Sequence, residues 1–290
     1  QWVAKKMACD KAGLKYLHGC EVYLTEKLLL TDPRTGEQNK VRDNYHTILI
    51  AKNYAGLQEM NELISRSNQG DHFYYKPRIT FDEFLGISSN VIKISACLAS
   101  PLNRMSITHP MYERLLKHYD YLEIQAHDHP EQVAYNRHLA EMSQKYGTPL
   151  IAGTDTHSLN KYKAECRTIL QLSKHIEFAD EDTFDLTYKS YDELVAMFAT
   201  QDALPEAMYL EAIENTNRMA DSVEPFELDI SFKYPILYGE RCFIKFLMIT
   251  YKQRSKRVLS LQSRSSRSKR LLLRNAGSLT KLRCPASCFS

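Results

Sequence analysis

The 290-residue sequence has no apolar run approaching about 20 residues, and this absence excludes a helix that spans a membrane. Its seven cysteines include no Cys-x-x-Cys pair, so the spacing typical of zinc ribbons is missing. It also lacks an initiator Met and a signal peptide, so we expect a cytoplasmic chain with reduced thiols that is cut at its N-terminus. What remains is a composition typical of globular proteins, 43% hydrophobic and 25% charged.

Acidic side chains are almost absent from the end of the chain. Residues 240–290 hold 13 Lys and Arg against one acid, Glu240, whereas residues 1–239 carry a net charge of −9. The stretch 252–274 also lacks turn residues and apolar periodicity. One interpretation is a basic arm that binds nucleic acid, and the other is a disordered or non-native tail. We assign no function to it.

Residues 1–239 alternate between strand and helix patterns. The sequence predicts strands at 16–24, 46–51, 91–95, 121–125 and 149–152, and helices at 2–11, 57–64, 81–85, 110–118, 131–146, 194–198 and 205–220. Capping boxes begin at Thr80 and Ser190, Gly147 ends a helix, and residues 31–37 form a turn-rich loop. This alternation favours an α/β fold with a parallel sheet, open or closed into a barrel.

An Asp-x-His motif follows the last predicted strand. The apolar run 149–152 leads directly into Gly153, Thr154, Asp155, Thr156 and His157. The strand is expected to end in this motif, and its period of two places Asp155 and His157 on the same side. Chemistry in α/β folds is placed at the carboxyl ends of parallel strands, so this pair is a candidate for metal ligation.

Other metal-capable side chains lie near the ends of other strands. Glu21 lies in the first strand, His46 opens the second and Cys97 closes the third. This mixture of nitrogen, oxygen and sulfur donors suits Zn, Mn or Fe, and such a site would lower the pKa of bound water and clamp a phosphate. Each residue could also have a purely structural role, and the sequence pattern alone does not decide between this role and metal ligation. His127 and His129 are the nearest candidates for supporting these ligands.

Seven segments carry a family resemblance, in order along the chain. They are Gly19–Tyr23, Tyr45–Asn53, Phe73–Ile79, Ser95–Ala99, Glu123–Gln125, Thr154–His157 and Glu214–Ala220. Over residues 1–237 they resemble the PHP (polymerase and histidinol phosphatase) domain of bacterial DNA polymerase III alpha subunits. The resemblance implies a distorted (β/α)7 barrel, N-terminally incomplete here. We expect the PHP domain at 1–188, a helical linker at 189–239 and the basic tail at 240–290.

The resemblance also implies a metal site. The matching ligand positions are Glu21, His46, Cys97, Asp155 and His157. Asp155 and His157 would take part in catalysis as metal ligands. In metal-competent members this site is linked to 3′–5′ exonuclease activity or pyrophosphate hydrolysis, and in others the domain is a scaffold for a proofreading subunit. Lys76 and Arg78 would either neutralise phosphate or form a structural salt bridge.

For the parent protein, the family implies a DNA-directed DNA polymerase that uses Mg at a site outside this sequence. Its expected partners are DNA, the sliding clamp and a proofreading exonuclease. The family's opening His-x-His strand would precede Gln1, so we expect a fragment that binds metal poorly and has little nuclease activity. The alternatives are a free-standing PHP phosphatase and a non-catalytic interaction module.

Overall fold

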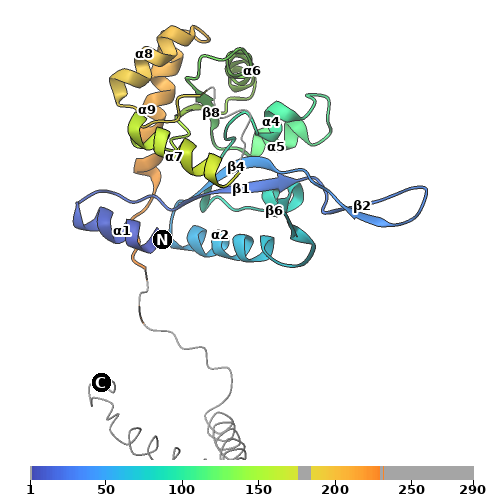
Figure 1. Ribbon diagram of the computed structural model, residues 1–290. Coiled ribbons are helices and arrows are strands. Elements are labelled where there is room, and N and C mark those ends of the chain that lie inside the picture. The colour runs from blue at the N-terminus through green and yellow to red at the C-terminus, as the bar shows by residue number, and fades with distance from the viewer. Residues whose placement is uncertain (1, 176–183, 229–230, 232–290) are drawn as a thin grey trace, which may run out of the picture. The chain divides into compact units, whose positions relative to one another are not determined.

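A mixed sheet organises the described part of this computed structural model, residues 2–175, 184–228 and 231 (Figure 1). The strands are β1 (Gly19–Thr25), β2 (Leu29–Thr31), β3 (Gln38–Lys40), β4 (Tyr45–Ala51), β5 (Phe73–Tyr74), β6 (Lys76–Thr80), β7 (Val91–Ile94), β8 (Leu122–Gln125) and β9 (Leu150–Gly153). The helices are α1 (Trp2–Lys11), α2 (Tyr54–Ser67), α3 (Phe81–Leu85), α4 (Pro101–Arg104), α5 (Tyr112–His118), α6 (Pro130–Tyr146), α7 (Lys161–Ser173), α8 (Tyr191–Gln201) and α9 (Glu206–Ser222). A 3-10 turn, η1, covers Gly70–His72.

Seven of the described strands follow one another in a single order, whereas β2 and β3 form a separate hairpin. Hydrogen bonds join β5, β6, β1, β4 and β7, and a bridge between Ile94 and Tyr121 leads on to the pair β8 and β9. The predicted α/β fold class is confirmed. Among the described strands, no ladder joins β9 back to β6, so these ladders do not themselves close a barrel.

Strand β4 runs against both of its neighbours, and the short β5 runs against β6, which corrects the expectation of a parallel sheet. The pairs β1–β6 and β8–β9 are parallel, but β4 is antiparallel to both β1 and β7. The physical reason lies in residues 26–44, which contain the β2–β3 hairpin and no helix. A parallel neighbour needs a long crossover, usually helical, whereas an antiparallel one does not. The start of β4 therefore lies at the edge where β1 and β7 end.

Apolar side chains from the sheet and its helices form the core. Leu57, Met60 and Leu63 are buried on α2, which packs on β4, β6 and β7, and this confirms the helical spacing. A second cluster joins Ile50 of β4 to Met219 of α9. Helices α8 and α9, which fall in the predicted linker, belong to the same compact unit as the other described residues up to 227.

The local signals in the sequence are reliable at helix ends. Both capping boxes are present, at Thr80 and Ser190, and Gly147 ends α6 with a left-handed φ of 79°. The loop at 31–37 is the connection of the β2–β3 hairpin.

Helix α7 was not predicted from the sequence. None of its residues is buried, so it lacks the buried apolar stripe from which a helix is usually predicted. None of the described helices is long and apolar enough to cross a membrane. The predicted tail, 240–290, lies outside the described residues.

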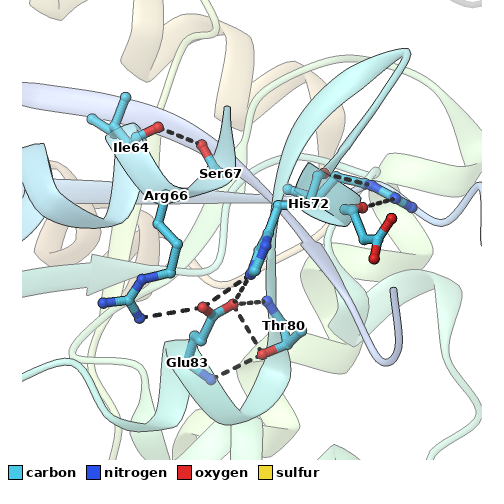
Figure 2. A network of polar contacts seen from close by, with 8 residues as sticks. Ile64, Arg66, Ser67, His72, Thr80 and Glu83 are labelled. Atoms are coloured by element: carbon cyan, nitrogen blue, oxygen red, sulfur yellow. Dashed lines mark hydrogen bonds and ion pairs between the residues drawn. The ribbon is translucent and has the colours of Figure 1, made fainter. Parts of the chain in front are cut away.

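A charged network ties the end of α2 to the start of α3, as Figure 2 shows. Glu83 accepts a hydrogen bond from the Thr80 backbone N–H at 2.8 Å, while its own N–H donates to the Thr80 hydroxyl. His72 and Arg66 lie 3.1 and 3.3 Å from the same carboxylate. Burial opposes the charged form, but these bonds and the charge of His72 together lower the pKa of Glu83.

We predict that Glu83→Gln lowers the free energy of unfolding at pH 7 by about 1–2 kcal/mol, because it removes a cap and a charged hydrogen-bond acceptor. A carboxylate with a lowered pKa stabilises the fold above its unfolded pKa and loses this effect as the pH falls through its folded pKa. The difference between the variant and the wild type should therefore shrink below about pH 4.5. Urea unfolding at pH 7 and pH 4 measures it.

The matched control is Glu62→Gln, at an exposed acid on α2, which should change stability by less than about 0.5 kcal/mol. Equal effects of the two substitutions would contradict the role given to Glu83.

Candidate functional site

The reversed strand brings three predicted ligands together. In the register of β1 and β4, Tyr23 lies opposite His46 and Glu21 lies opposite Ile48. The Nδ1 atom of His46 is 3.3 Å from Oε1 of Glu21 and 3.7 Å from Sγ of Cys97. Had β4 run parallel to β1, its first residues would lie at the opposite edge of the sheet. The direction of this strand is therefore what allows His46 to meet the other two side chains.

The loop after β7 holds Cys97 in place. Ala96 adopts a left-handed backbone with φ of 63°, which is uncommon for a residue with a side chain. The chain then turns back, and the backbone N–H of His46 donates to the carbonyl of Ala99 at 2.9 Å. This bond fastens the loop to the start of β4. A strained residue held by its surroundings next to a cluster of polar groups is typical of functional sites.

Asp155 and His157 meet in a loop and not on a strand, which corrects the expected period-two geometry. Strand β9 ends at Gly153, and Asp155 has a left-handed φ of 46°. The Nδ1 atom of His157 lies 3.7 Å from Oδ1 of Asp155 and 2.6 Å from its backbone carbonyl. The backbone N–H of His157 donates to Leu186 at 2.8 Å. The turn, together with this anchor, sets the position of the pair.

The electrostatics of the site favour uncharged side chains. Burial lowers the pKa of His46 to about 4, and the charges of Lys76 and Arg104 add to the shift, so its imidazole is neutral at pH 7. Burial raises the pKa of the Cys97 thiol to about 12, and nearby carboxylates raise it further against an opposing backbone bond from Ala99. Burial and Asp155 also raise the pKa of Glu21.

Sequence reasoning missed Glu123 as part of this cluster. Its side chain is buried, and Gln125 donates a 2.7 Å hydrogen bond to Oε1. Burial raises the pKa of Glu123 to about 7, and the charges of Asp155 and Glu21 raise it against the opposing bond from Gln125. Gly153 leaves the room for this carboxylate, because a Cβ there would overlap it. The available signal was a lone acid in the apolar strand Leu122–Gln125.

The two predicted phosphate-binding residues differ in their setting. Arg78 is 1% exposed, and its guanidinium donates to the backbone carbonyls of Val41, His72 and Asp71. This places Arg78 in a structural role, with backbone partners in place of the expected salt bridge, and removes it from contact with phosphate. Lys76 is half-buried beside the site, and its charge acts on both Glu21 and His46.

His127 and His129 lie at the end of β8, where a supporting role was predicted. Both ring nitrogens of His127 and Nδ1 of His129 are buried without a hydrogen-bond partner. Phe184 packs on the His127 ring with centroids 4.7 Å apart. Burial lowers the pKa of His127, while Asp155 opposes the shift. Among the described residues, these buried ring nitrogens have no hydrogen bond to any of the five predicted ligands, so the supporting role of the two histidines stays a prediction.

The predicted ligands are assembled in part. They form one set around His46 and a separate pair, Asp155 with His157. Within residues 2–175, 184–228 and 231, no group of three or more His, Cys, Asp and Glu side chains is arranged to hold a metal ion. The donor types suit a transition metal, but their positions do not yet form a cage.

Known proteins are similar to this chain in sequence. Residues 2–129 match the PHP domain family, a range that includes Glu21, His46 and Cys97 and ends before Asp155. The chain is 31% identical over 253 residues to a DNA polymerase III subunit alpha of Borreliella burgdorferi, covering 81% of this chain and 21% of that protein. Identity to the subunit alpha of Aquifex aeolicus is 31% over 239 residues, or 76% of this chain and 20% of that protein. A PolC-type DNA polymerase III of Pediococcus pentosaceus is 28% identical over 236 residues, or 76% and 16%.

The fold and the site thus define an α/β protein with a PHP domain. More narrowly, the chain carries a PHP domain and is similar over most of its length to DNA polymerase III alpha subunits. It spans about a fifth of the length of the first two relatives.

We predict that the free energy of unfolding of the wild type falls as the pH rises and that Glu123→Gln abolishes this fall. A buried acid with a folded pKa of about 7 favours folding less and less as the pH rises from 4.5 to 7, by roughly 3 kcal/mol in total. The amide keeps the shape without this titration. Urea unfolding should therefore find the variant no less stable than the wild type at pH 5 and more stable at pH 8. Glu141→Gln, at an exposed acid on α6, is the control, and parallel pH profiles for Glu123→Gln and the wild type would contradict the assignment.

A second prediction concerns Gly153. Because an added Cβ would overlap the Glu123 carboxylate, Gly153→Ala should destabilise the fold by about 2–3 kcal/mol. The double variant Gly153→Ala with Glu123→Ala should recover more than half of that loss relative to Glu123→Ala alone, as measured in a double-mutant cycle. Additive effects of the two substitutions would mean that the contact does not limit this position.

Proposed function

We propose that this chain is the PHP portion of a replicative DNA polymerase of the III alpha type and that its site binds a divalent metal, Zn, Mn or Fe. One observation carries the proposal. The reversed strand β4 brings the His46 imidazole to 3.3 Å from the Glu21 carboxylate and to 3.7 Å from the Cys97 thiol. Asp155 and His157 complete the proposed ligand set at the same edge of the sheet.

The side chains are prepared for this role to different degrees. His46 is neutral at pH 7 because its pKa is about 4, so its lone pair is available to a metal. Cys97 must lose the proton of a thiol whose pKa is about 12, and a cation is the partner that makes this loss favourable. When bound, the metal would supply a polarised water and charge neutralisation for phosphoester hydrolysis. Lys76 would orient a phosphate beside Glu21.

The activity of the whole protein is also a proposal, because the chain spans only about a fifth of the length of the Borreliella burgdorferi and Aquifex aeolicus relatives. We propose a cytoplasmic, DNA-directed DNA polymerase with Mg at a separate polymerase site. Its partners would be DNA, the sliding clamp and a proofreading exonuclease. The PHP site would contribute 3′–5′ exonuclease or pyrophosphate hydrolysis.

A scaffold role is the second candidate, and the incomplete assembly of the ligands favours it. If the two ligand sets never close on a metal, the domain would dock a proofreading subunit without chemistry of its own. Metal binding therefore separates the two candidates.

We predict weak binding of Mn²⁺ and Zn²⁺, because no three donors already surround one point among the described residues. Titration calorimetry should detect one class of sites, and dialysis followed by elemental analysis should leave less than one equivalent. Cys97→Ser should weaken binding at least tenfold. With Co²⁺ as the probe, the same substitution should remove the absorption band of a thiolate ligand.

The matched control is Cys166→Ser, at an exposed thiol on α7, which should bind metal like the wild type. Metal binding unaffected by Cys97→Ser would exclude Cys97 as a ligand. No binding at millimolar metal would favour the scaffold role.

A further inference from the structure

An exposed tyrosine occupies a strained position at the tip of a hairpin. Tyr75 joins β5 to β6, has a left-handed φ of 59° and is 75% exposed. Such positions favour Gly or Asn, and a bulky residue there is a genuine outlier. The ring is not a core anchor, because most of it faces solvent. A conformational cost without burial points to a use for the exposed ring.

Cations and further aromatic rings surround this tip. The Tyr74 and Tyr75 ring centroids are 4.6 Å apart. The Arg42 guanidinium lies 5.6 Å from the Tyr75 ring, and the Lys40 ammonium lies 5.9 Å from the Tyr74 ring. Phe73 is 46% exposed on the same short strand. We call this surface the basic–aromatic track, and it consists of Lys40, Arg42, Phe73, Tyr74, Tyr75 and Lys76.

The track leads to the candidate metal site. Tyr74 pairs with Lys76 across the hairpin, and the Lys76 ammonium lies 4.3 Å from the Tyr23 ring. The Tyr23 ring in turn meets the His46 ring edge-on, with centroids 5.0 Å apart. The first step is a backbone pairing within the hairpin, and the next two are contacts between side chains. A ligand that lies along the track would therefore reach the residues around His46.

We propose that the basic–aromatic track binds single-stranded nucleic acid. Alternating rings and cations match the alternation of bases and phosphates in a single strand, whereas the bases of a duplex are stacked on one another and unavailable. Lys40, Arg42 and Lys76 provide the positive charge, although Lys40 also contacts Asp71 at 3.5 Å. This local charge stands out in residues 1–239, whose net charge is −9. The inference rests on the proposed function in one respect only, namely that a strand bound along the track reaches a hydrolytic metal site around His46.

The test measures binding without hydrolysis. A fluorescein-labelled 20-nucleotide strand of thymidines is titrated with the full chain in EDTA and followed by fluorescence anisotropy. Tyr75→Gly removes the ring and relieves the backbone, so the variant should fold at least as well as the wild type. We expect its affinity to fall about five- to a hundredfold, the range for losing one stacked base. Arg42→Gln should reduce the salt dependence of binding by about one phosphate contact.

The matched control is Tyr162→Ala. Tyr162 is 68% exposed on α7 and has the Lys163 ammonium 5.6 Å from its ring, so it is an exposed tyrosine beside a cation outside the track. Its affinity should equal that of the wild type. An affinity of Tyr75→Gly within twofold of the wild type would overturn the proposal. So would a change of oligomeric state in Tyr75→Gly at unchanged affinity, since the surface would then be a protein interface.

A second measurement tells whether the strand binds at the track or at the basic sequence 240–290. Strands that carry 5-iodouracil are photo-crosslinked to the wild type, and the attached peptides are identified by mass spectrometry. Crosslinks to Phe73 or Tyr75 support the track, and crosslinks only within 240–290 refute it. Because EDTA is present throughout, these results do not depend on metal. A chain that binds the strand but no metal would refute the proposed metal site alone, and the reverse result would refute the track alone.

Discussion

The direction of β4 is the constraint on which the rest of the site depends. A hairpin in place of a crossover helix lets this strand return antiparallel to β1, so its first residues lie where β1 and β7 end. His46 thereby lies within 3.7 Å of both Glu21 and Cys97. The same reversal places Ile50 in the core cluster with Met219, so the strand serves packing on one part and chemistry on another.

The site concentrates acidic groups where burial opposes their charge. Glu21, Cys97 and Glu123 all have raised pKa values, and the charge of Asp155 contributes to each shift. Gly153 is the structural counterpart, because a Cβ at this position would overlap the Glu123 carboxylate where it now lies. This excess of potential negative charge is what a cation would relieve, and it is consistent with a metal site that assembles on binding.

The candidate metal site and the basic–aromatic track have complementary electrostatics. The first gathers groups that can become negative, whereas the second presents Lys40, Arg42 and Lys76 beside aromatic rings. Lys76 belongs to both regions, since its charge acts on Glu21 and His46. A polyanion held along the track would thus place a phosphate next to the residues that could take part in its hydrolysis.

Local pattern and composition were sufficient to predict the α/β class, the capping boxes, most strands and helices, and the residue types of the site. Tertiary structure alone decided that Arg78 is buried on backbone carbonyls and that Asp155 and His157 meet in a left-handed turn. It also decided that His46 reaches Cys97 and that Glu123 is buried beside Gly153. The direction of β4 and the burial of these particular polar side chains arise from contacts between segments distant in the chain, which the local patterns do not specify.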